Sequence, residues 1–429
     1  MSLLHKENAP AVHDSAIVTK HFEDAAQGTA GRTIPDVPLA VHINHTPFPS
    51  QYFQSVDQHG EVFHVVVLRV TYDMHRTLPD GCLAYAAPQT PLEAQDVWSG
   101  AVNESSPLWE SDFAPYKPKC DVLVVNAVSR PPPEHLDAER WPCGIALQWV
   151  GDDGEKQTWS KSLTVTGPRQ FGLISLSAPA HTDEVAIDWC NGFGGQIKRP
   201  HTAEIRPDGS VKKAAGSVRW DVDERNPVGV GFNKAMGQPG PQLELMQQHY
   251  TAGFGQDDYP PVGLSALGKA WLPRRLLAGT YDEAWLKEQW PLPPLDFDDA
   301  YWNCAPQDQQ VDYLAPSTQL TLVNLYPPRD VSDAGNSWVQ SWGGRLPSHQ
   351  LSLRLALRIG GERLVHDSDM ALDTLVVDLA SQKIYATFRH AIANSALQEQ
   401  KIEGLETWVS PAGRPYDAVP PDELSSLEI

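Results

Sequence analysis

The chain has 429 residues and a formal charge of −21, from 33 Lys and Arg against 54 Asp and Glu with His neutral. This length allows two or three domains with a large core, and an apolar fraction of 41% with 14 Trp excludes a wholly disordered chain. The acidic balance argues against nucleic-acid or anionic-membrane partners, which are negatively charged themselves. Two short basic runs, Ile197–Arg199 and Val211–Lys213, are interpreted as solvated loop charges.

The cysteines and the N-terminal sequence bear on the cellular compartment. The five cysteines are odd in number and scattered, and no CxxC or mixed Cys/His pair has zinc-site spacing. We therefore expect reduced thiols in a reducing compartment. No apolar signal-peptide core and no stretch of ~20 apolar residues is found. The sequence thus predicts a cytoplasmic protein without membrane insertion, and no motif predicts a cofactor.

The first third of the chain predicts mostly strands. Residues 1–35 lack periodicity and are predicted to form a flexible arm. Residues 36–190 are predicted to form an N-terminal β-sandwich region, because short apolar runs alternate with Gly and Pro turns. The run Glu61–Met74 is too apolar to leave one face in water, so we expect a central strand covered on both faces. Further strands are expected at Cys82–Ala86, Asp121–Val128, Cys143–Val150, Gln157–Thr166 and Val185–Cys190.

Residues 191–312 are predicted to be a loop-rich middle region. Its Gly-rich pieces do not fit a dinucleotide-binding loop, because Gln196–Pro200 runs into proline where that motif needs a helix. We expect irregular loops that pack over the sandwich. The last part, Ala270–Gln310, crowds aromatic and acidic side chains together with five prolines.

One short helix is predicted inside this crowded stretch, over residues 281–289. Thr280 and Glu283 have capping-box spacing, with Thr280 as N-cap and Glu283 at N3. Tyr281 and Trp285 then share one helix face, and Pro291 ends the helix. About two turns are not stable alone, so the helix must dock on the rest of the protein.

Regular β patterning returns in residues 313–410, the predicted C-terminal β region. Leu351–Ile359 alternates Leu or Ile with more polar residues and predicts a strand with one buried face. Strands are also expected at Gln319–Leu325, Leu372–Leu379 and Lys383–Arg389, and a polar loop at Asp330–Trp342. Residues 411–429 are predicted to be a disordered acidic tail. The predicted fold class is mainly β, with β-sandwich-like regions at both ends, a Gly/Pro-rich middle and one or two short helices. Whether the two β regions form one body or two is open.

Two groups of residues suggest chemistry. Two carboxylates in an aromatic cleft are typical of a glycosidase, and Asp282 with Asp296 or Asp298 meets that description. We favour local roles instead: Asp282 at the helix N-terminus, and Asp296 and Asp298 as loop caps around Phe297.

The histidines His42, His45, His59 and His64 suggest a metal only weakly, because no third ligand has suitable spacing. No GxSxG elbow is present, so no nucleophile motif is found.

Seven segments, spread over most of the chain, carry a family resemblance. They are Glu110–Val124, Leu163–Phe171, Asn191–Gly195, Asn226–Phe232, Ala252–Gly255, Ala278–Gln310 and Leu372–Asp378. Their order resembles the bacterial type VI secretion adaptor/chaperone family, long catalogued as a domain of unknown function. One departure is WCNGFGG (Trp189–Gly195), where the family pattern has an aromatic-Glu-Arg-Ala approach. The resemblance implies a non-enzymatic protein that holds an effector toxin and helps to load it onto the spike and its PAAR-type tip.

The resemblance makes the crowded stretch the candidate site, either for partner binding or as a brace between the β regions. The candidate residues are Tyr281, Asp282, Trp285, Trp290, Asp296, Phe297, Tyr301, Trp302 and Asn303. We favour the brace and expect Trp285 and Trp302 to be buried. The alternatives are a carbohydrate-active hydrolase, suggested by the Trp and carboxylate density, a glycan-binding β-protein or a scaffold. No pattern predicts the effector or the oligomeric state.

Overall fold

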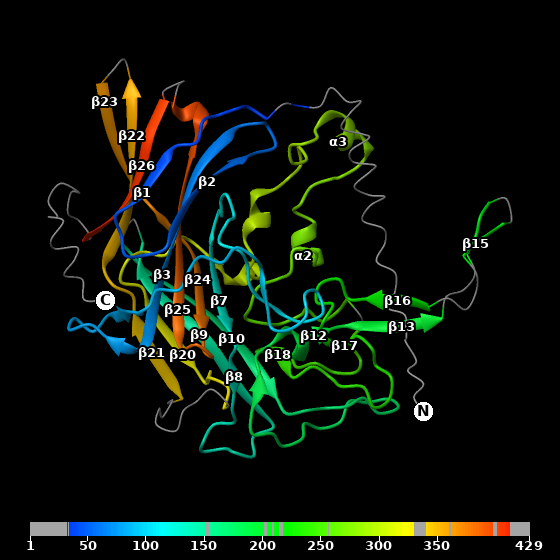
Figure 1. Cartoon of the computed structure of the whole chain (residues 1–429). Helices are drawn as coiled ribbons and strands as arrows, with labels where there is room; N and C mark the ends of the chain where they lie inside the picture. The colour runs from blue at the N-terminus through cyan, green and yellow to red at the C-terminus, as the bar shows by residue number, and fades with distance from the viewer. Residues whose placement is uncertain are drawn as a thin grey trace, which may run out of the picture.

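The structure, a computed structural model, describes residues 32, 34–151, 154–200, 204–207, 210–213, 218–255, 257–329, 340–359, 362–397 and 401–411. Strands dominate this part of the chain, with two short α-helices, α2 (Leu272–Arg275) and α3 (Glu283–Glu288) (Figure 1). The predicted mainly β fold with short helices is confirmed. The predicted arm and tail, residues 1–35 and 411–429, lie almost entirely outside the described residues, as does most of the loop predicted at Asp330–Trp342.

A seven-stranded sheet forms the centre of the molecule. Its order is β19-β7-β24-β25-β3-β2, and β4 also pairs with β3. The strands are β2 (Ser50–Val56), β3 (Val62–Thr77), β4 (Leu83–Tyr85), β7 (Cys120–Val125), β19 (Gln310–Val311), β24 (Ala371–Asp378) and β25 (Lys383–Ala393). The pair β24–β7 is parallel and the other pairs are antiparallel. Strands from both predicted β regions therefore share one hydrogen-bonded sheet.

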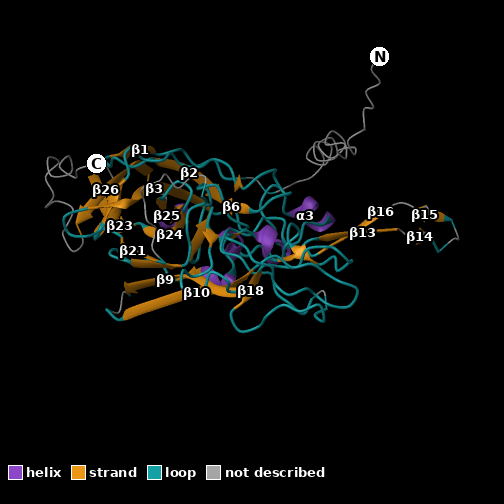
Figure 2. Cartoon of the chain, turned by 90° about the horizontal axis from the view of Figure 1, so that it is seen from below, coloured by secondary structure: helices purple, strands orange, loops and turns teal. Residues whose placement is uncertain are grey.

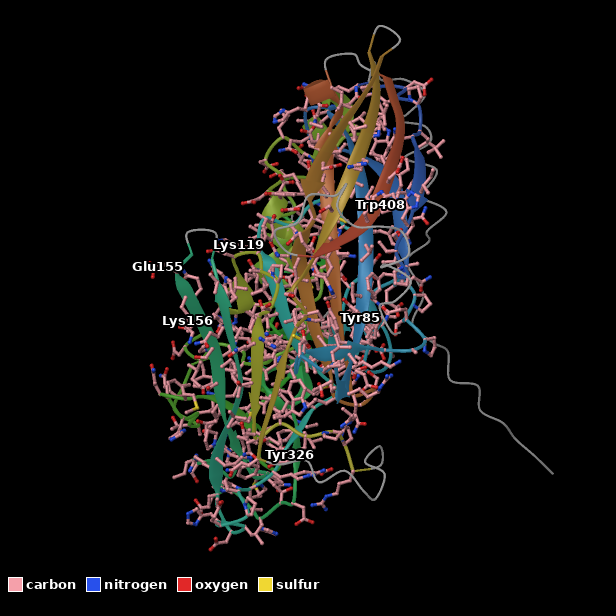
Figure 3. All side chains as sticks on the ribbon, turned by 90° about the vertical axis from the view of Figure 1, so that its left-hand side faces the viewer. Tyr85, Lys119, Glu155, Lys156, Tyr326 and Trp408 are labelled. Atoms are coloured by element: carbon pink, nitrogen blue, oxygen red, sulfur yellow. The ribbon has the colours of Figure 1, made fainter. Side chains whose placement is uncertain are left out.

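A five-stranded sheet, in the order β18-β10-β9-β20-β21, packs on one face of the central sheet. Its strands are β9 (Arg140–Val150), β10 (Lys156–Thr166), β18 (Leu243–Leu245), β20 (Gln319–Val323) and β21 (Ser341–Arg345). Side chains fill the space between the two sheets (Figure 3). In that view, Glu155 and Lys156 lie at the five-stranded sheet on one side, and Tyr85 and Trp408 lie on the other side. The start of β21 at Ser341 places Trp342 in a strand, where the sequence predicts a loop.

Alternation along β7 shows why its residues are uniformly apolar. Val122 and Val124 belong to the large core between the sheets. Leu123 and Val125 point to the opposite face, into a second cluster with Trp109, Cys304 and Ala305. The sequence of a strand that is covered on both faces is a nearly continuous run of apolar residues. The same reasoning holds for β3, whose consecutive residues His64–Tyr72 are all buried, so both of its faces are covered as predicted.

A four-stranded sheet brings the two ends of the described chain together. Its order is β1-β26-β22-β23, and β1 (Val41–Asn44) lies parallel to β26 (Lys401–Pro411). The other strands are β22 (His349–Ile359) and β23 (Glu362–Asp369). Leu351 and Leu353 of β22 are buried in the large core, as the alternating pattern predicts.

A two-stranded ribbon projects from the body (Figures 1 and 2). It consists of β13 (Gln196–Pro200) and β16 (Val218–Val222), with β14 (Glu204–Ile205) and β15 (Val211–Lys213) beyond them. The two basic runs lie in β13 and β15, so their interpretation as loop charges is wrong. The two segments become strands because each pairs with a neighbouring strand, and not because their sequences have an apolar pattern. The solvated character of the first run is confirmed, since Lys198 and Arg199 are exposed.

The predicted strand at Val185–Cys190 is shorter than expected. Only Val185–Ala186 forms β11, which pairs with β8 (Val128–Ser129). Asp188 then accepts a hydrogen bond from the Cys190 N–H and starts the 3-10 helix η1 (Trp189–Asn191). The remaining elements are β5 (Val97–Trp98), β6 (Pro107–Trp109), β12 (Phe193–Gly194), β17 (Val230–Gly231), η2 (Asp299–Trp302), η3 (Gln307–Gln309) and η4 (Asn394–Leu397). Across the described ranges, no helix has the length and apolar character that a membrane crossing requires.

Candidate functional site

The short helix of the candidate site starts later than predicted. Asp282, not Thr280, is the N-cap of α3, and its Oδ1 accepts a hydrogen bond from the Trp285 N–H at 2.8 Å. The Thr280 hydroxyl and N–H instead donate to Asp296 at 2.7 and 2.9 Å. The predicted capping box is therefore wrong. Both residues are good caps by type, and the distant carboxylate of Asp296 engages Thr280.

The three carboxylates considered for catalysis all have local hydrogen-bonding roles. Asp282 caps α3, and Asp298 caps η2 by accepting from the Ala300 N–H at 2.9 Å. The backbone and hydroxyl hydrogen bonds from Thr280 lower the pKa of Asp296. These are the roles that the sequence favours for Asp282, Asp296 and Asp298.

The aromatic residues form two groups of rings in edge-to-face or tilted contact. Tyr281 and Trp290 lie 4.7 and 5.7 Å from Trp285, between ring centroids, and the Trp285 Nε1–H donates to the Leu292 carbonyl at 3.0 Å. Phe297, Tyr301 and Trp302 pack against one another with centroids 5.5–6.0 Å apart. Trp285 and Trp302 are half-buried, so the expected burial is wrong. Trp285 lies on α3, which has no buried residues, and Trp302 lines an open pocket, so neither ring is covered on all sides.

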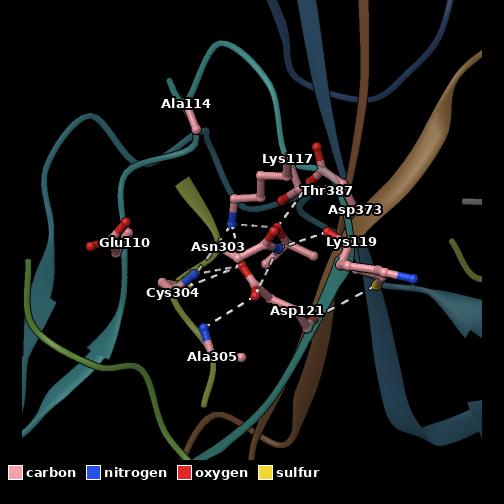
Figure 4. Close-up of polar contacts among 12 residues, drawn as sticks. Glu110, Ala114, Lys117, Lys119, Asp121, Asn303, Cys304, Ala305, Asp373 and Thr387 are labelled. Carbon is pink, nitrogen blue, oxygen red and sulfur yellow. Dashed lines mark hydrogen bonds and ion pairs between the residues drawn. The ribbon is translucent and has the colours of Figure 1, made fainter. Parts of the chain in front are cut away.

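Asn303 joins the segment to the central sheet through a buried carboxylate. Asp121, at the start of β7, is fully buried and accepts hydrogen bonds from Asn303 Nδ2 at 3.0 Å and from the Cys304 and Ala305 N–H groups at 2.9 and 3.1 Å (Figure 4). The Lys117 ammonium lies 2.7 Å from the same carboxylate. Burial by itself would raise the pKa of Asp121, but Lys117 and the N–H donors lower it below its usual range.

Lys117 is also fully satisfied. Its ammonium donates to Asp121 and, at 2.9 Å, to the Thr374 hydroxyl of β24. Burial opposes the charged form, yet the neighbouring carboxylate raises the pKa of Lys117 above its usual value. An ion pair with this geometry is held in its charged state and has no free lone pair or proton for chemistry.

Three further buried ion pairs surround this one. Arg274 of α2 forms a two-pronged pair with Glu110, with the Nη2–Oε2 contact at 3.1 Å, and its Nε–H donates to the Tyr301 carbonyl. Asp373 pairs with Arg389 at 2.9 Å, and Asp112 pairs with Arg69 at 2.8 Å. All six side chains are buried.

Sequence reasoning missed these residues. The sequence feature that could have revealed them is a charged residue next to an apolar run. Asp121 stands directly before VLVV, and Asp373 stands directly before TLVV. Such a charge is almost never fully buried unless it is paired.

The Gly-rich pieces form an interlocked structural unit. Asn226 is fully buried, and its amide donates to the Trp189 and Phe193 carbonyls at 2.9 and 3.0 Å. Gly194 has φ +145°, and a Cβ there would lie 2.2 Å from the Asn226 carbonyl oxygen. The glycine permits this approach of two backbones. The segments Asn191–Gly195 and Asn226–Phe232 are therefore explained by packing.

An open pocket of about 270 Å³ lies between the aromatic segment and the β2–β3 hairpin. Its residues are Ser55, Val56, Asp57, Gln58, Phe63, Pro115, Tyr116, Pro293, Phe297, Asp299, Trp302 and Ala391. Partial burial, followed by the charges of Asp298 and Asp57, raises the pKa of Asp299. Of the predicted site residues, Phe297 and Trp302 line this pocket. Gln289 ties its rim together by donating to the Gln58 and Pro293 carbonyls.

The remaining candidates have ordinary contacts. His42 lies 2.8 Å from the Thr407 hydroxyl, His45 stacks on Trp408, and His64 lies 2.8 Å from the Tyr52 hydroxyl. No cluster of three or more His, Cys, Asp or Glu suited to a metal ion occurs among the residues that the structure describes. All five cysteines are free thiols, and four are buried.

Fold and site together define a mainly β protein in which an aromatic, proline-rich segment is fixed to the central sheet by buried ion pairs and borders an open pocket. The chain belongs to the family described as "Uncharacterized protein conserved in bacteria (DUF2169)", whose model matches residues 59–389. The matched range contains the central ion pairs and most of the pocket. Neither a curated protein nor a solved structure matches the chain.

Proposed function

We propose that this protein is a non-enzymatic adaptor/chaperone that binds a type VI secretion effector and assists its loading onto the spike/PAAR complex. The starting point is the resemblance of seven segments, all of which lie within the range that the bacterial family model matches. One structural observation carries the argument further. The buried charged groups of these segments are paired internally, whereas three of their aromatic side chains, Tyr116, Phe297 and Trp302, line an open pocket.

The internal bonding favours a scaffold role for the resembling segments. Asp121, Asn303 and Arg274 are buried. Asn303 donates a hydrogen bond to Asp121, and Arg274 donates one to the Tyr301 carbonyl. A catalytic acid, base or nucleophile must reach a substrate. These groups instead fix the position of the aromatic segment, so that Phe297 and Trp302 are presented at the pocket on a rigid support.

The open surface suits a protein partner. Protein interfaces concentrate binding energy in a few aromatic residues at a pocket, and Phe297, Trp302 and Tyr116 provide such residues here. A second exposed apolar feature lies elsewhere, at the turn Gly172–Ser175, where Leu173 and Ile174 are 89% and 95% exposed. Such exposed apolar side chains are suited to covering apolar surface on a client.

Co-expression tests this proposal. The protein is produced with the toxin encoded beside its gene, and we expect more soluble toxin and a complex that co-elutes in size-exclusion chromatography. Trp302→Ala should weaken the complex, while the matched control Trp220→Ala, on the ribbon and 54% exposed, should leave it intact. Failure to associate with any neighbouring toxin or spike protein would contradict the adaptor function.

A second candidate function, a carbohydrate-active hydrolase or glycan-binding protein, is favoured by one observation. Asp57 and Asp299 share the pocket with aromatic rings, an arrangement that also suits sugars. A glycan binding and hydrolysis screen separates the two functions. Activity that Asp299→Asn abolishes, or that the earlier candidates Asp282→Asn or Asp296→Asn abolish, would support the hydrolase and not the adaptor.

A further inference from the structure

The pocket beside the aromatic segment has a composition that selects a ligand class. Its aromatic walls come from separate parts of the chain: Phe63 from β3, Tyr116 from the loop before β7, and Phe297 and Trp302 from the aromatic segment. Tyr116 is 44% exposed and the other three rings are half-buried, so ring surface remains open to a ligand. The faces of aromatic rings carry partial negative charge and attract cations.

The polar side of the pocket is negative. Asp57 and Asp299 both line it, and none of its twelve lining residues is Lys, Arg or His. Oδ1 of Asp57 accepts the His59 and Glu61 N–H groups at 2.8 Å, which fixes the carboxylate in place. In the part of the chain that the structure describes, no hydrogen bond or ion pair joins the Asp299 side chain to another residue.

The carboxylates of this pocket differ from those of the protein interior in the partners that they face. The buried carboxylates Asp121, Asp373, Glu110 and Glu244 each face a Lys or Arg at hydrogen-bond distance. At the pocket, two carboxylates and the neighbouring Asp298 act on one another, and no Lys or Arg of the described chain lines it. Asp299 is exposed and Asp57 half-buried, so both carboxylates are accessible to a positively charged ligand.

The volume of the pocket limits the size of the ligand that it can receive. Ligand pockets for drug-sized molecules usually span about 300–1,000 Å³, and this pocket has about 270 Å³. It therefore suits one side chain better than an oligosaccharide. The apolar lining of Val56, Pro115, Pro293 and Ala391 matches a methylene chain that leads to a charged end.

We propose that this pocket receives an arginine side chain of the protein partner, with the guanidinium beside Asp57 and Asp299 and against the aromatic rings. Arginine is favoured over lysine because its planar group stacks on aromatic faces and pairs with carboxylates through two parallel hydrogen bonds. A neutral sugar would leave the repulsion between the carboxylates in place. As a statement about the partner, the inference rests on the proposed adaptor function.

A small-molecule titration tests the pocket without the partner. N-acetyl-L-arginine methylamide is titrated into the full chain, with N-acetyl-L-citrulline methylamide as the neutral probe of the same shape, and binding is followed by NMR. We expect the arginine probe to bind about tenfold more tightly than the citrulline probe, as a cation–π contact together with an ion pair would give. Asp299→Asn should remove most of this preference, and Asp312→Asn, an exposed site outside the pocket, should preserve it.

The outcomes separate the two proposals. Equal binding of both probes, or a preference for a neutral sugar, overturns the arginine pocket even where the toxin complex forms. A preference for arginine that Asp299→Asn removes supports the pocket even where no toxin associates, and then the adaptor function alone fails. Trp302→Leu is a second variant, expected to weaken the arginine probe. Urea unfolding of each variant shows whether the fold is retained, so that lost binding is not mistaken for unfolding.

Discussion

The Lys117 ammonium lies 2.7 Å from the Asp121 carboxylate, and the two side chains are 3% and 0% exposed. The same carboxylate also receives the Asn303 amide and the N–H groups of Cys304 and Ala305. One ion pair at the start of β7 therefore anchors the end of the aromatic segment. The geometry couples the stability of the fold to the position of the candidate site.

Lys117→Met should lower the free energy of unfolding by about 3–5 kcal/mol, because it leaves the Asp121 charge buried without a cation. The control is Lys119→Met. Lys119 pairs with Asp312, and these side chains are 49% and 79% exposed, so its loss should cost less than about 1 kcal/mol. Urea unfolding followed by circular dichroism measures both. Equal losses in the two variants would show that burial of the pair is not decisive.

Arg274 and its neighbour Arg275 provide a second matched comparison. Arg274 is 2% exposed and holds Glu110 with two hydrogen bonds, whereas Arg275 pairs with Glu224 at the surface. Arg274→Met should cost about 3–5 kcal/mol and Arg275→Met less than about 1 kcal/mol in urea unfolding. Arg274→Lys should restore only part of the loss, because an ammonium cannot form the two-pronged pair. Full rescue by lysine would argue against that geometry.

Gly194→Ala tests the interlocked Gly-rich unit. The added Cβ would meet the Asn226 carbonyl at 2.2 Å in a backbone of φ +145°, so we expect a loss of about 3 kcal/mol or more. Gly237→Ala is the control. Its φ is +82°, but nothing lies within 4 Å of the new atom, so only the conformational cost of about 1–2 kcal/mol applies. Thermal and urea unfolding should rank the two variants in this order, and the reverse order would contradict the packing explanation.

His64 makes stability depend on pH near neutrality. The residue is 1% exposed, and burial lowers its pKa below 6.5, although a hydrogen bond to the Asn394 amide oxygen opposes this shift. The unfolded chain then binds a proton at a higher pH than the folded chain does. Stability should therefore fall as the pH drops below about 6.5. Burial lowers the pKa of His42 and His349 as well, so both act in the same direction.

Urea midpoints at about pH 7.5 and about pH 5.5 measure this dependence. The wild type should lose stability at the lower pH, and His64→Gln should lose less between the same two points. The difference between the two pH values is the readout, because the substitution also changes stability at both. An unchanged difference in His64→Gln would exclude a contribution from His64.

Local patterns predict the strands and hairpins well. The apolar runs of β3 and β7, the alternation of β22, and the β9–β10 and β24–β25 hairpins all follow from periodicity and turn residues close in sequence. Short pieces without such a pattern were missed, among them β2, β23 and the ribbon strands. The basic run in β13 becomes a strand only because β16 pairs with it.

At the candidate site, sequence alone determined which stretch matters and which residue types it contains. Its aromatic crowding, prolines, short helix and loop-capping carboxylates are visible in the residues themselves. Only the tertiary structure decided how these residues are used, because the deciding partners lie 16 to 182 positions away along the chain. Asp296 engages Thr280 and leaves Asp282 to cap the helix, and Asp121 reaches Asn303 from 182 positions away. A buried charge needs a partner of opposite sign or several donors, but no local pattern shows which one it will meet.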